Sequence, residues 1–200
     1  IVLSGSIAKD YLGNDYIYDE YSTAVYGIMM NTEKSIFKSD KLRYALLFAS
    51  DKSSLCLPFG YSAAAGIVAP SVKNSFGSYR DTAGSRTTVK PDEVKAYSSY
   101  QSACENIDKA DLHSVNILAV QNRDEEIGES LSGILQQWQA KLGFYCSISY
   151  VSESEYEEKI SGGDYTLALT RINGEYNRPE AYLGMFISGG YKYSAMDDAY

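Results

Sequence analysis

The stretch that decides the fold is Asn31–Lys52, which reads NTEKSIFKSDKLRYALLFASDK. It follows the short apolar run Thr23–Asn31, TAVYGIMMN, whose β-branched and aromatic residues predict a buried strand. Asp40 is a residue type that caps helices, and apolar side chains then recur at helical spacing. These apolar positions are Leu42, Ala45, Leu46 and Ala49. The stretch therefore predicts a strand and then a helix that buries one face.

The regions on either side of this stretch are less regular. Residues 1–22 are polar and Tyr-rich without helical periodicity, so we expect a loop with at most a short strand there. After a further helical turn at Asp51, glycines and prolines predict a long irregular connection to about Pro91. Pro91, Asp92 and Glu93 suit the first turn of a helix, which we expect to reach about Ala110.

The second half of the chain alternates strand and helix patterns. We expect strands at Ser114–Val120, Phe144–Val151 and Tyr165–Thr170. An amphipathic helix is predicted at Glu125–Leu142, ended by Gly143. Ser152 and Glu155 form a capping-box pattern for another helix, which ends by Gly162. This alternation predicts an α/β layer arrangement whose strand order the sequence leaves open.

Composition excludes several classes of function. The chain has 18 basic and 26 acidic residues, a net charge of −8 and no long basic run, so nucleic acid is not expected as a partner. The 19 tyrosines suit recognition of ligands that are partly polar and partly apolar. No apolar run approaches the roughly 20 residues of a spanning helix, and no signal peptide is present. Because the chain starts at Ile1, we expect it to be a piece of a longer protein.

Catalytic patterns are weak. His113 is the only histidine, and a dyad with Cys56 or Cys104 has no local signature to support it, although the sequence leaves it open. The acidic clusters near residues 124–129 and 153–158 are explained by helix starts. No phosphate-binding loop, dinucleotide motif or metal-ligand spacing is present. We therefore predict a protein that is not an enzyme and has neither a catalytic residue nor a metal or cofactor.

The cysteines allow two interpretations. Cys56, Cys104 and Cys146 are widely separated and form no CxxC pair, which favours small buried hydrophobic side chains. One disulfide with a leftover thiol stays open.

Asn31–Lys52 resembles the signature region of the family 5 extracellular solute-binding proteins, the peptide and nickel binders of ABC transporters. Leu42 and Arg43 occupy that family's Val-Arg position, and the order of elements in the second half is similar as well. The resemblance implies a type II periplasmic-binding-protein-like lobe, with a mixed sheet flanked by helices. Residues 23–200 would form a single α/β lobe of a two-lobed protein, after a Tyr-rich leading segment at 1–22. The other lobe, the return strands and a lipoprotein anchor would be absent.

The resemblance also implies a ligand site within Thr170–Pro179, TRINGEYNRP. In oligopeptide-binding members this segment leaves a strand, lies along the backbone of the bound peptide and supplies an acid for its α-amino group. Three residues fall on the backbone-contacting positions, Arg171, Ile172 and Asn173, and Glu175 falls on the acidic one. The family more often has Asp at that position. The alternatives are a solvated turn acid for Glu175 and a surface charge for Arg171.

The expected function is that of the substrate-binding component of an ABC transporter, which captures peptides outside the membrane for a permease. Alternative ligands are a nickel chelate, an oligosaccharide or another small solute. A sensory or protein-interaction domain on the same fold is the rival from a different class. The implied location is extracytoplasmic, as a periplasmic protein or a cell-surface lipoprotein that meets the membrane only through its anchor.

Overall fold

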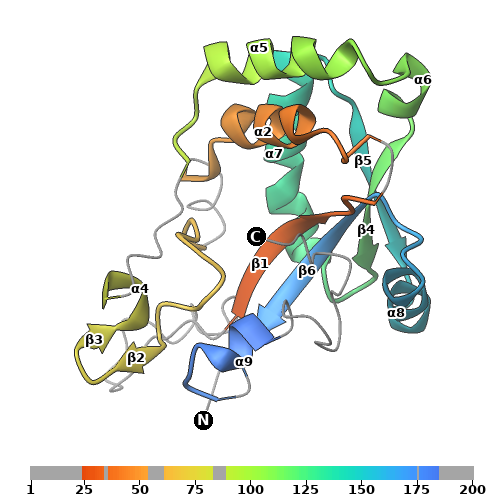
Figure 1. The fold of residues 1–200 in the computed structure, drawn as a ribbon. Coiled ribbons are helices and arrows are strands. Elements are labelled where there is room, and N and C mark those ends of the chain that lie inside the picture. The colour runs from red at the N-terminus through yellow and green to blue at the C-terminus, as the bar shows by residue number, and fades with distance from the viewer. Residues whose placement is uncertain (1–23, 34–35, 54–60, 83–88, 175, 185–200) are drawn as a thin grey trace, which may run out of the picture.

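A four-stranded mixed sheet forms the centre of the molecule in this computed structural model, which describes residues 24–33, 36–53, 61–82, 89–174 and 176–184 (Figure 1). The strands lie in the order β1-β6-β4-β5. Their bounds are Ala24–Met30 for β1, Val115–Val120 for β4, Cys146–Val151 for β5 and Leu167–Asn173 for β6. β4 is parallel to β5 and β6, whereas β1 is antiparallel to β6. The leading segment 1–22 lies outside the described residues.

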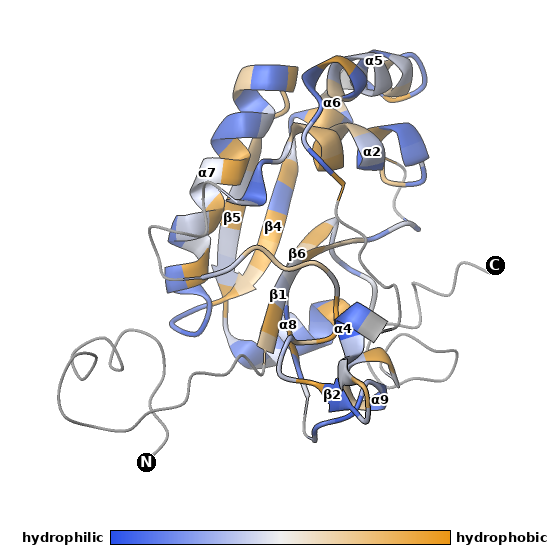
Figure 2. Cartoon of the chain, turned by 90° about the vertical axis from the view of Figure 1, so that its left-hand side faces the viewer, coloured by the Kyte–Doolittle hydropathy of each residue, from blue (hydrophilic) through white to orange (hydrophobic). Residues whose placement is uncertain are grey.

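Helices cover both faces of this sheet (Figures 1 and 2). On one face pack α2 (Asp40–Ala49), α5 (Glu93–Cys104) and α7 (Glu125–Leu142). The other face carries α8 (Glu153–Ser161). Shorter elements are α4 (Tyr79–Thr82), α6 (Lys109–Leu112), α9 (Glu180–Leu183) and the hairpin of β2 (Lys73–Asn74) and β3 (Gly77–Ser78). The predicted α/β class, a mixed sheet flanked by helices, is confirmed. None of the described helices is both long and apolar enough to cross a bilayer.

The core has three parts. The largest lies under α2, α5 and α7 and includes Phe37, Leu42, Leu46, Trp138 and Leu167. A second joins the sheet to α8 through Leu118, Val120, Tyr156 and Ala168. The third packs the end of β6 against α9 and the segment before β2, with Val25, Val72, Ile172 and Tyr182. This third cluster fixes the end of the sheet where the candidate site lies.

The start of α2 follows the sequence expectation with one shift. The N-cap is Ser39, whose Oγ accepts from the Leu42 N–H at 3.4 Å, and Asp40 is the acid of the first turn instead. Arg43 donates to the carbonyls of Phe37 and Lys38 at 2.6 and 3.3 Å. These bonds tie the helix to the segment that precedes it.

The helix expected from Pro91 to about Ala110 is interrupted. Asp92 caps α5 by accepting from the Lys95 N–H at 3.0 Å, and this helix ends at Cys104. Asp108 then accepts from the Ala110 N–H at 2.9 Å and starts α6 as a separate helix. An aspartate side chain that bonds its own neighbouring backbone competes with continued helix, which explains the break.

The second half agrees more closely with the prediction. α7 spans Glu125–Leu142, and Gly143 ends it at φ 71°, a left-handed conformation that favours glycine. Ser152 caps α8 by accepting from the Glu155 N–H at 3.3 Å. β6 begins later than predicted and continues to Asn173 rather than ending at Thr170, because β1 pairs with it as far as Ala24↔Asn173. Part of the expected ligand segment is therefore strand.

Candidate ligand-binding site

The last residues of β6 present alternate main-chain groups to the two sides of the strand. The Asn31 N–H donates to the Thr166 carbonyl at 3.0 Å, and this register pairs Val25 with Ile172. Because facing residues of an antiparallel ladder bond in alternation, the main-chain groups of Ile172 point toward β1. Those of Arg171 and Asn173 point toward the opposite side.

On that opposite side, β4 accompanies β6 for a short distance only. The paired residues are Ile117↔Leu167 and Leu118↔Ala168. Arg171 and Asn173 lie past this stretch, and no strand of the described part of the chain pairs with them there. An unpaired strand edge is a template for an extended peptide, and open α/β sheets bind ligands beyond the carboxyl ends of their parallel strands.

The side chains in this segment have different roles. Ile172 is buried in the third core cluster and anchors the strand. Arg171 is exposed, with its guanidinium carbon 6.0 Å from the centre of the Tyr26 ring. Asn173 is exposed at the end of the strand. The sequence does not distinguish these three residues, but the structure does. The main-chain groups of Arg171 and Asn173 point away from β1, and those of Ile172 point toward it.

The turn after β6 is tied to α9. A Cβ at Gly174 would lie 2.2 Å from Cε2 of Tyr182, so the ring rests directly on the glycine. The Lys73 N–H donates to the Asn177 side chain at 3.3 Å, which joins this turn to the hairpin. Glu175, the expected partner of a peptide amine, lies outside the described residues.

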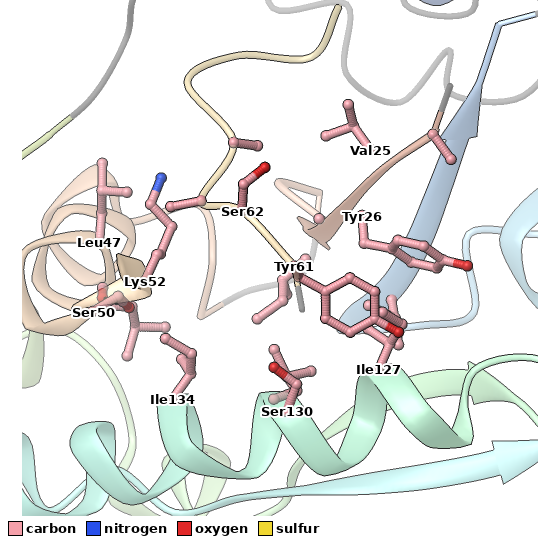
Figure 3. A pocket seen from close by; sticks show the side chains of 18 of the residues that line it. Val25, Tyr26, Leu47, Ser50, Lys52, Tyr61, Ser62, Ile127, Ser130 and Ile134 are labelled. Carbon is pink, nitrogen blue, oxygen red and sulfur yellow. Dashed lines mark hydrogen bonds between the residues drawn. The ribbon is translucent and has the colours of Figure 1, made fainter. Parts of the chain in front are cut away.

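A cavity of about 550 Å³ lies beside β1, between α2, α7 and residues 61–64. Figure 3 shows Ile127, Ser130 and Ile134 of α7 pointing into it, with Tyr61 on the opposite side. Its apolar lining includes Leu46, Trp138 and Leu169, and its polar lining includes Tyr26, Ser50 and Lys52.

The tyrosines of this cavity are held in their neutral form. Burial and a hydrogen bond to Glu126 raise the pKa of Tyr61 to about 12. Burial also raises the pKa of Tyr26, against the opposing charge of Arg171. Both phenols can therefore donate or accept hydrogen bonds at neutral pH. Sequence reasoning missed this cavity because its walls come from segments far apart in the chain, and the abundance of tyrosine was its only signal.

The residues considered for catalysis are not assembled around this cavity. His113 caps the end of α6, with its ring 6.3 Å from that of Tyr145, and neither His113 nor Cys104 lines the cavity. Cys104 and Cys146 are free thiols, while Cys56 lies outside the described residues. In the described ranges, no group of three His, Cys, Asp or Glu side chains is placed to hold a metal.

The four-stranded mixed sheet with helices on both faces gives the chain a fold of the periplasmic-binding-protein type. Residues 4–194 match the model of the bacterial extracellular solute-binding proteins, family 5 middle region, so the chain belongs to that family, as the sequence predicted. This is a family of solute-binding proteins rather than of enzymes.

Solved structures share the fold at low sequence identity. The pheromone receptor PrgZ, described with its mode of peptide binding, is 20% identical with a TM-score of 0.73, over 97% of this chain and 38% of its own. The substrate-binding domain of an oligopeptide ABC transporter from Bacillus anthracis str. Ames is 21% identical with a TM-score of 0.73. The match covers 98% of this chain and 38% of that protein. OppA of Listeria monocytogenes, bound to peptide, is 17% identical with a TM-score of 0.71. The match covers 95% of this chain and 38% of that protein. The chain thus spans about 38% of the length of these proteins. No curated protein matches it.

Proposed function

We propose that residues 23–200 are one lobe of a two-lobed substrate-binding protein that captures peptides outside the cytoplasm for an ABC permease. The observation that carries this proposal is the outward-facing main chain of Arg171 and Asn173, past the end of the β4 pairing. The family and the peptide-binding proteins of the same fold support it. The complete protein would be extracytoplasmic, either as a periplasmic protein or as a lipoprotein anchored at the cell surface.

Two contacts would recognise the peptide. Main-chain bonds to Arg171 and Asn173 would accept an extended peptide of any sequence. Glu175, one residue past Gly174, would take the α-amino group and set the direction of the peptide, with a contribution of about 1.5–3 kcal/mol. Ile172 would hold the strand in place by its burial in the third core cluster.

The role of Glu175 is tested by Glu175→Gln in the complete protein, titrated with one peptide and its N-acetylated form. We expect roughly a tenfold or greater loss of affinity on acetylation in the wild type and little further loss in the variant. Glu180→Gln, an exposed acid in the first turn of α9, is the matched control and should behave as wild type. Equal effects of acetylation in all three proteins would remove Glu175 from the site.

A small solute is the second candidate ligand, favoured by the cavity beside β1. Its volume of about 550 Å³ and its apolar walls with tyrosine and serine hydroxyls are typical of sites for compact ligands. Titration with nickel chelates and oligosaccharides beside the peptides distinguishes the two candidates.

A further inference from the structure

The pairing of β4 with β6 ends where two side chains replace the next main-chain bonds. The Gln121 N–H donates to the Val151 carbonyl at 2.8 Å in β5, so the adjacent Val120 directs its main-chain groups toward β6. Continuing the register Leu118↔Ala168, the Val120 N–H would donate to the Leu169 carbonyl. The Arg171 N–H would then donate to the Val120 carbonyl.

Three of these four groups have another partner. The Val120 N–H donates to Oδ2 of Asp124 at 2.9 Å, and the Val120 carbonyl accepts from the Asp124 N–H at 3.0 Å. The Leu169 carbonyl accepts from the hydroxyl of Tyr156 at 3.0 Å. Asp124 and Tyr156 thus occupy the hydrogen-bonding positions that would otherwise join the two strands.

These two residues form one unit with Arg123. Asp124 is fully buried and accepts from Nε and Nη2 of Arg123 at 3.0 and 3.1 Å. The guanidinium of Arg123 lies 5.5 Å from the centre of the Tyr156 ring and also bonds Glu153 at 3.0 Å. The unit therefore links the start of α7 to α8 across the end of β4.

Arg123 keeps its positive charge over the neutral range. Burial lowers the pKa of Arg123, but the hydrogen bond and charge of Asp124 outweigh it, so the net change is an increase. A buried carboxylate is costly unless it is paired, and extending the strand ladder would satisfy the same main-chain groups without it. Asp124 is paired with Arg123, and it takes the Val120 main-chain groups that a longer ladder would use.

We propose that Asp124 and Tyr156 are positioning residues that stop the β4–β6 ladder and so keep the main chain of Arg171 and Asn173 open for a ligand. The ligand part of this inference rests on the proposed function. The structural part does not, because the end of the ladder can be measured without any peptide.

The test is hydrogen exchange of the Arg171 amide in the complete, ligand-free protein, compared between wild type and Tyr156→Phe. Removing the hydroxyl leaves the Leu169 carbonyl without this donor, and the Val120 N–H can then exchange its bond to Asp124 for one to Leu169. The ladder extends, and the Arg171 amide exchanges about tenfold or more slowly. Tyr165→Phe removes a hydroxyl from the same cluster and is the matched control, with exchange unchanged. Unchanged Arg171 exchange in Tyr156→Phe, with Leu118 still protected, would overturn the inference.

A second variant tests the bond between Asp124 and the Val120 N–H. Asp124→Ser keeps a residue type suited to the start of α7 but is too short to make the same bond to Val120, so the Arg171 amide should again exchange more slowly. Peptide titration completes the test: both variants should bind about tenfold or more weakly than wild type because the edge is occupied. Slower exchange with unchanged affinity would contradict the positioning role. A wild type that binds no peptide would remove the proposed function and leave the exchange result standing.

Discussion

Gly174 connects the open edge of β6 to the core because the Tyr182 ring rests on its α-carbon. We expect Gly174→Ala to displace the ring and lower the free energy of unfolding by about 1–3 kcal/mol. Urea unfolding measures this loss. Gly184→Ala is the control, since nothing lies within 4 Å of a Cβ there, and it should change stability by less than about 0.5 kcal/mol. Equal stability of the two variants would show that the ring does not depend on this contact.

Cys146 should be chemically inert in the folded protein. Burial raises the pKa of its thiol to about 12 from a usual value of 9.0, so its thiolate fraction at pH 8 is about a thousand times smaller than that of an ordinary thiol. Alkylation with iodoacetamide, followed by mass spectrometry, should leave Cys146 unmodified until urea unfolds the chain. Rapid labelling of the native protein would contradict this burial.

The same shift makes a pH-dependent contribution to stability. In the unfolded chain the thiol ionises near its usual pKa, whereas in the folded chain its pKa is about 12. The free energy of unfolding therefore contains the full contribution of the neutral Cys146 thiol below pH 9, and this contribution is lost as the pH rises toward 12.

The sequence located the residues of the β6 segment but could not orient them. Arg171, Ile172 and Asn173 follow one another, and the register with β1, more than 140 positions earlier in the chain, decides which of them directs its main chain away from β1. Asp124 was interpreted from the sequence as an ordinary helix-start acid. Its bond to Val120 depends on a turn through Asn122 at φ 62°, which no spacing rule predicts.

The contact between α2 and α7 depends on Trp138. Its indole N–H donates to the Leu46 carbonyl at 3.1 Å and to the Ser50 hydroxyl at 2.9 Å, inside the main core cluster. We expect Trp138→Phe to lower the free energy of unfolding by about 1–3 kcal/mol, through the lost bonds and the smaller side chain. Urea unfolding again provides the measurement. Tyr97→Phe, at an exposed position of α5, is the control, and a Trp138 effect no larger than the control's would contradict this role.

Helix and strand positions were predicted best where one local signal decides them. The stripe of α7, the glycine that ends it and the serine cap of α8 agree with the structure. The break between α5 and α6 was missed because Asp108 lies within an otherwise helical pattern. The longer β6 was missed because its last residues are strand through pairing with β1, which is a tertiary effect.

At the scale of the whole molecule, the described residues include the open strand edge of β6 and the cavity beside β1, and the chain spans about 38% of the solved proteins that it resembles in fold. In the proposed two-lobed protein, closure would bury the ligand between the lobes, so high affinity would require both of them. The exposed tyrosines Tyr44, Tyr97, Tyr145, Tyr150 and Tyr176 lie on several elements. They would serve a protein partner if the domain were sensory rather than a transport component.

Isothermal titration calorimetry with short peptides of unrelated sequence decides between these functions. It is carried out in parallel on the complete protein and on this 200-residue chain. We predict that the complete protein binds the peptides and that the 200-residue chain binds them weakly or not at all. Failure of the complete protein to bind any peptide would contradict the proposed role in peptide capture.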